Sequence, residues 1–118
     1  MHYVIEYDKN GPFMRQYSPG DYTWAEAVAR LNVLRREWAA KILGSGDGIS
    51  TKWFASIWGC DAPKVRGRLR KMPGMIATQT EGTGRIGGRY ADDVWQLASY
   101  EEAGALERAL DAIFSVQT

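Results

Sequence analysis

Residues 49–72 read ISTKWFASIWGCDAPKVRGRLRKM, and this stretch decides the fold. Ser50 or Thr51 can cap a short helix, and the apolar positions of that helix are Trp53, Phe54, Ile57 and Trp58. Gly59 then permits a sharp turn, because a left-handed backbone is readily adopted only by glycine. Asp61 can cap a second helix with Pro63 in its first turn, where a missing N–H group costs nothing. The stretch therefore predicts two short helices joined by a tight turn.

The residues after the turn predict a helix followed by a β-hairpin. Val65, Leu69 and Met72 fall at helical spacing and form one core-facing side of the second helix, which is expected from Ala62 to Met72. The hairpin is expected as a strand over 76–80, a glycine-rich tip over 81–88 and a returning strand over 89–97.

Residues 49–97 resemble the winged helix-turn-helix of bacterial regulators such as the MarR and GntR families. The resemblance rests on the small Ala55 four residues before Gly59, on the apolar spacing of the second helix, and on the glycine and two apolar residues at 74–76. In these families the connection between the second helix and that glycine is usually charged, whereas the connection in this chain is tighter. The resemblance implies a transcriptional regulator, bacterial or from a phage, whose second helix enters the major groove of DNA.

The outward side of the second helix is strongly basic. At about 100° per residue, the arc opposite the apolar side has Gly67 at its centre. A glycine inside a helix costs about 1 kcal/mol relative to alanine, and a bare backbone there would let the helix approach base edges closely. The residues expected to face bases are Lys64, Arg66, Gly67 and Arg70. The residues expected to hold phosphates, or to contact DNA from the wing, are Lys52, Arg68, Lys71, Arg85 and Arg89.

Charge is distributed unevenly along the chain, although the net charge is only +1. Residues 50–90 hold eight basic and two acidic side chains, a net charge of +6, and the rest holds seven basic and twelve acidic ones, a net charge of −5. A basic segment between acidic flanks favours an anionic partner, and we expect double-stranded DNA. Two alternatives use the same basic side: an interaction module that binds an acidic protein, and binding to structured RNA.

The N-terminal part predicts a β-hairpin and a long amphipathic helix. Residues 3–7 are β-branched or aromatic at four of five positions, which predicts a strand, and an Asn-Gly turn leads to a second strand at 12–17. Thr23 and Glu26 match a capping box. The helix that follows is expected over 24–43, with an apolar stripe made of Trp24, Ala27, Val28, Leu31, Leu34, Trp38 and Ile42.

The C-terminal part predicts one more helix. Ser99 and Glu102 match a second capping box, which predicts a helix over 100–116. The two amphipathic helices need partner surfaces, so the expectation is either a homodimer through helices 24–43 and 100–116 or packing within one subunit. The fold class is therefore α+β, and the expected segments, packed as one unit, are 1–48, 49–98 and 99–118.

The remaining residues argue against an enzyme and against a bound cofactor or metal. A single His and a single Cys leave no zinc cluster and no Ser-His-Asp arrangement. Residues 82–87 match the dinucleotide-binding pattern G-x-G-x-x-G, but no capped helix follows them. Cys60 cannot form an internal disulfide, and the absence of a signal peptide or long apolar run favours a cytoplasmic protein without membrane contact. The tryptophans expected in the core are Trp53, Trp58 and Trp95.

Overall fold

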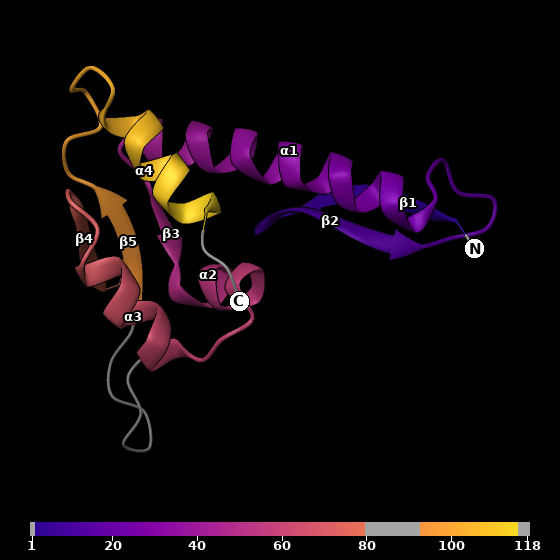
Figure 1. Cartoon of the computed structure of the whole chain (residues 1–118), viewed down its shortest axis with the longest axis horizontal. Coiled ribbons are helices and arrows are strands. Elements are labelled where there is room, and N and C mark those ends of the chain that lie inside the picture. The colour runs from indigo at the N-terminus through magenta and orange to yellow at the C-terminus, as the bar shows by residue number, and fades with distance from the viewer. Residues whose placement is uncertain (1, 80–92, 116–118) are drawn as a thin grey trace. The chain divides into compact units, whose positions relative to one another are not determined.

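The chain is seen in a computed structural model that describes residues 2–79 and 93–115. It folds into two compact units, Met1–Ala39 and Ala40–Thr118, and each is described by itself. The fold class is α+β, as expected, with a two-stranded sheet, a three-stranded sheet and helices among the described residues (Figure 1). No helix in these described ranges is long and apolar enough to cross a membrane.

The first unit begins with the expected hairpin. Strands β1 (Tyr3–Asp8) and β2 (Gly11–Gln16) are antiparallel, with Asp8 opposite Gly11 at the turn. Gly11 has a φ of 89°, and a Cβ there would lie 2.7 Å from the ring of Trp38. Glycine is therefore required at this turn both by the backbone and by the close approach of the tryptophan.

The long helix α1 (Trp24–Gly44) follows and begins at the predicted capping box. The Thr23 N–H donates to Glu26 Oε1 at 3.0 Å, and the Glu26 N–H donates to Thr23 Oγ1 at 3.3 Å. The hydrogen bond from the Thr23 backbone N–H to the carboxylate is the main cause that lowers the pKa of Glu26, and the Thr23 side chain lowers it further, because both stabilise the ionised form. Trp24, the first residue of the predicted apolar stripe, is 59% exposed, and its ring meets that of Tyr3 edge to face.

A three-stranded antiparallel sheet organises the second unit. Its strands, in the order β3-β5-β4, are β3 (Gly48–Ser50), β5 (Asp93–Leu97) and β4 (Met75–Gln79). The sequence did not predict β3, since a three-residue strand between a glycine-rich joint and a helix is defined by its pairing with β5 rather than by its own composition. A Cβ at Gly48 would lie 2.1 Å from Val94 Cγ1, so this pairing requires glycine.

The hairpin formed by β4 and β5 agrees with the prediction at its base. Met75 pairs with Leu97 at one end, and Gln79 pairs with Asp93 at the other. The expected tip at 81–88, together with Arg85 and Arg89, lies outside the described residues.

The C-terminal helix α4 (Ala105–Phe114) begins later than predicted. The Ser99–Glu102 capping box does not form; instead the Glu102 N–H donates to the backbone oxygen of Ser99 at 2.9 Å in a turn. The cause is Gly104, whose φ of 78° is left-handed and cannot belong to a right-handed helix. The buried residues of α4 are Ala105, Ala109, Leu110 and Ile113.

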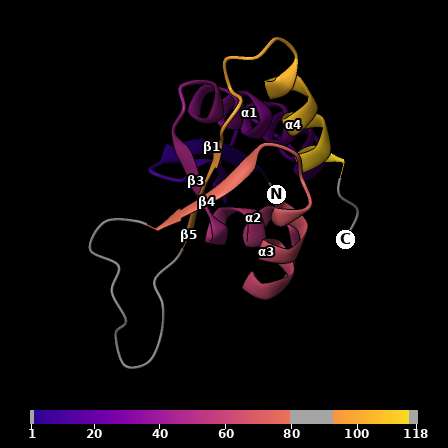
Figure 2. The same cartoon turned by 90° about the vertical axis from the view of Figure 1, so that its left-hand side faces the viewer.

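Helices α2 (Thr51–Trp58) and α3 (Ala62–Arg70) complete the second unit. They pack on each other, and each also contacts the sheet, α2 through β3 and β5 and α3 through β4. Figures 1 and 2 both show α2 and α3 toward one end of this sheet and α4 toward the other.

The three tryptophans predicted to be structural lie in the core of this unit. Trp53, Trp58 and Trp95 are 6%, 2% and 1% exposed. The Trp58 Nε1–H donates to the backbone oxygen of Ile113, and the Trp95 Nε1–H donates to Thr51 Oγ1, both at 2.9 Å. Each of these two rings is therefore buried with its polar group paired.

Candidate nucleic-acid interface

The two short helices are joined by a three-residue turn whose geometry follows the sequence. The Ser50 hydroxyl accepts a hydrogen bond from the Trp53 N–H at 3.3 Å and so caps α2. Gly59 ends the helix with a φ of 63°, and its N–H donates to the Ala55 oxygen at 2.9 Å. Asp61 Oδ1 then accepts from the Lys64 N–H at 3.2 Å and caps α3. The predicted caps and the predicted turn are confirmed.

Helix α3 buries one side and exposes the other. Val65 and Leu69 are both fully buried, as predicted. The predicted end at Met72 is wrong, because α3 ends at Arg70. The residue before a proline is disfavoured in helical conformation, and Pro73 accounts for this earlier end.

Gly67 lies on the outward side of α3 and has no packing reason to be glycine. A Cβ built there would meet no atom within 4 Å. Lys64 and Arg70 lie three residues before and three after it and are exposed, whereas Arg66 is half-buried. Residues three apart share one face of a helix, so Lys64 and Arg70 lie on the same face of α3 as Gly67, whereas Arg66, next to Gly67 in sequence, lies at a different angle around the helix.

Arg68 lies at the flank of this surface and is held in place by the turn. Its guanidinium lies 5.6 Å from the ring centroid of Trp58, and its Nη1 is 3.6 Å from Cys60 Sγ. The sequence predicted Arg68 as a phosphate contact but missed its packing role. Helical spacing cannot show this role, because the two partners belong to the preceding helix and to the turn.

The other predicted phosphate contacts are spread around the two helices. Lys71 is exposed at the C-cap of α3, and Lys52 is exposed in the first turn of α2. Between residues 52 and 71 the chain carries six basic side chains, and the acidic side chain there, Asp61, is used as a helix cap. The outer side of this helix pair is therefore an anion-attracting surface.

The major groove admits an α-helix, and an arginine can donate two hydrogen bonds to the O6 and N7 atoms of a guanine. The bare backbone at Gly67 removes the side chain that would otherwise hold the helix axis away from the base edges.

Comparison with known proteins adds no relative from which a function could be transferred. No protein-family model matches the chain, and no curated protein or solved structure is similar to it.

Proposed function

We propose that this chain is a non-catalytic, cytoplasmic protein that binds double-stranded DNA through a winged helix-turn-helix and regulates transcription in a bacterium or a phage. The helix-turn-helix is α2, the turn at 59–61, and α3. The hairpin of β4 and β5 follows directly and would be the base of the wing. This order of elements supports the proposal.

The observation that carries the proposal is the outward side of α3. Gly67 is an open position in the middle of a helix, with Lys64 and Arg70 on the same face and Arg66 beside it in sequence. A glycine there weakens the helix without any gain in packing, so its advantage has to come from something that approaches the helix from outside. In this proposal α3 lies in the major groove, and the arginines read base edges.

The remaining basic residues would fix the position of the protein on the duplex. Lys52 and Lys71 would bind phosphates on either side of the groove. Arg68 would do so with less loss of conformational entropy than a free side chain, because Trp58 and Cys60 already hold its guanidinium. Arg85 and Arg89 would contact DNA from the wing.

A fluorescence-anisotropy titration with random-sequence duplex DNA tests the proposal. We expect micromolar binding at low salt that weakens steeply as salt rises, because bound lysines and arginines release counterions from the DNA. The double variant Arg66→Ala/Arg70→Ala should bind at least about tenfold more weakly. The matched control, Arg30→Ala/Lys41→Ala, removes two exposed charges from α1 and should bind as the parent does.

The same titration separates the alternatives. Competition by duplex RNA as strong as that by duplex DNA would support the RNA hypothesis over ours. Absence of DNA binding even at low salt would contradict the proposal and leave the acidic-protein hypothesis, which relies on the same basic surface of α3.

A further inference from the structure

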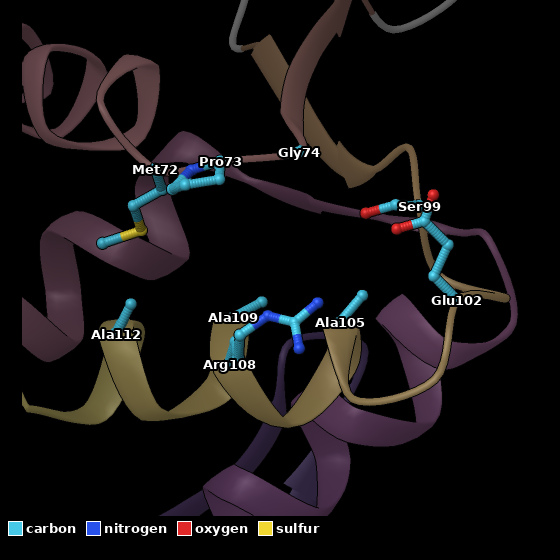
Figure 3. A pocket seen from close by; sticks show the side chains of 9 residues that line it. All are labelled: Met72, Pro73, Gly74, Ser99, Glu102, Ala105, Arg108, Ala109 and Ala112. Atoms are coloured by element: carbon cyan, nitrogen blue, oxygen red, sulfur yellow. The ribbon is translucent and has the colours of Figure 1, made fainter.

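A cavity of about 320 Å³ lies in the second unit, between α4 and the connection that directly follows α3 (Figure 3). Its walls come from the connection between α3 and β4, from the connection between β5 and α4, and from α4 itself. The apolar residues that line it are Met72, Pro73, Ala105, Ala109 and Ala112. Small-molecule sites are mostly apolar and begin at about 300 Å³, so this cavity is large enough for a small ligand.

The cavity exists because α4 presents small side chains to it. The three alanines recur at intervals of four and three residues, which places them on one side of the helix. The opposite wall cannot close the space, since Pro73 and Gly74 hold the chain in a fixed bend and Gly74 has a φ of 83°.

Three polar side chains also line this cavity. Within the described ranges, the side chains of Ser99, Glu102 and Arg108 form no hydrogen bond or ion pair with the protein. Glu102 and Arg108 carry opposite charges and are exposed, so both remain available to a ligand.

These polar groups are not scattered around the cavity. In Figure 3, Met72, Pro73 and Ala112 lie at one end, and Ser99 and Glu102 lie at the other. The Arg108 side chain runs along α4 toward Ala105 and directs its guanidinium to the polar end. The cavity is therefore apolar at one end and carries both a cation and an anion toward the other.

We propose that this cavity binds a free α-amino acid with an apolar side chain. The guanidinium of Arg108 would bind the carboxylate of the ligand, and Glu102 would accept hydrogen bonds from its ammonium group, with the hydroxyl of Ser99 as a further partner. The side chain of the ligand would lie against Met72 and Ala112. A simple carboxylic acid would bring a second negative charge near Glu102 and give that carboxylate no partner. A simple amine would bring a second positive charge near Arg108 and give that guanidinium no partner.

Isothermal titration calorimetry of the full chain, without DNA, tests this inference. L-Leucine, 4-methylpentanoic acid and 3-methylbutylamine share one apolar body and differ in their charged groups. We expect L-leucine to bind with a Kd of about 1 mM or tighter and each analogue to bind at least about tenfold more weakly. Arg108→Gln and Glu102→Gln should each weaken L-leucine by about tenfold, whereas Glu101→Gln, an exposed neighbour outside the cavity, should not.

Three results would overturn the inference. The first is that L-leucine, L-methionine and L-phenylalanine give no heat of binding at about 10 mM. The second is that 4-methylpentanoic acid binds as tightly as L-leucine. The third is that both cavity variants bind L-leucine as the parent does. Because DNA is absent, none of these results bears on the proposed function of α3.

Discussion

At the scale of single residues, Gly67 and Arg68 are neighbours in sequence, but only Arg68 has packing contacts with the rest of the fold. The position of Gly67 is open, and no part of the described structure needs a glycine there. Arg68 instead contacts the buried ring of Trp58 and the thiol of Cys60. Substitutions at the two positions should therefore change the stability of the fold in opposite directions.

Gly67→Ala should stabilise the fold and weaken DNA binding. Alanine is favoured over glycine in a helix by about 0.5–1 kcal/mol, and the new methyl group meets no atom of the protein. The same methyl group would stand between the helix and the base edges, so we expect a several-fold loss of affinity for duplex DNA. Urea unfolding and anisotropy measure the two effects, and unchanged or tighter DNA binding would contradict a close approach at this position.

Arg68→Ala should destabilise the fold by about 0.5–1 kcal/mol, the usual size of a cation–aromatic contact at a partly exposed site. Arg70→Ala is the matched control, because Arg70 is exposed at the end of the same helix and should change stability by less than about 0.5 kcal/mol. Equal unfolding free energies for the two variants would show that the contact with Trp58 does not stabilise the protein.

At the scale of the elements, local capping determines where the helices of the interface begin. Asp61→Ala removes the side chain that accepts from the Lys64 N–H, and loss of such a cap costs about 1 kcal/mol. Asp47→Ala, an exposed aspartate in a turn, is the control and should be nearly neutral. Thermal unfolding followed by circular dichroism measures both, and a neutral Asp61→Ala would mean that α3 does not depend on its cap.

The capping box of α1 should contribute to the pH dependence of stability. Hydrogen bonds from Thr23 lower the pKa of Glu26 in the folded state. A carboxyl group with a lowered folded pKa contributes stability above its unfolded pKa and loses it as the pH falls through the folded value. Glu26→Gln should therefore flatten the loss of stability on acidification, as measured by urea unfolding across the acidic range. An unchanged pH profile would contradict this role.

Two similar sequence patterns show how far local prediction reaches. Thr23–Glu26 and Ser99–Glu102 both match a capping box, but only the first forms one. In the second, the left-handed Gly104 ends the turn and delays α4 until Ala105. A four-residue pattern gives no information about the backbone conformation of a glycine two positions later, so it could not predict where α4 begins.

At the scale of the whole molecule, the sequence predicted the parts that depend on spacing and missed those that depend on tertiary contacts. The caps and turn of the helix pair, the buried side of α3 and its basic outer side follow from residues near one another in the chain. Strand β3, the packing of Arg68 on Trp58 and the cavity beside α4 each need segments that meet only in the fold.

The most direct test of the central claim is an NMR titration of the isotope-labelled chain with duplex DNA, followed residue by residue through the backbone amides. We expect the largest shifts on α3, with the amide of Gly67 among them, and little effect on the strands β1 and β2. Shifts concentrated on β1 and β2, or no shifts at low salt, would contradict the claim that the basic side of α3 binds DNA.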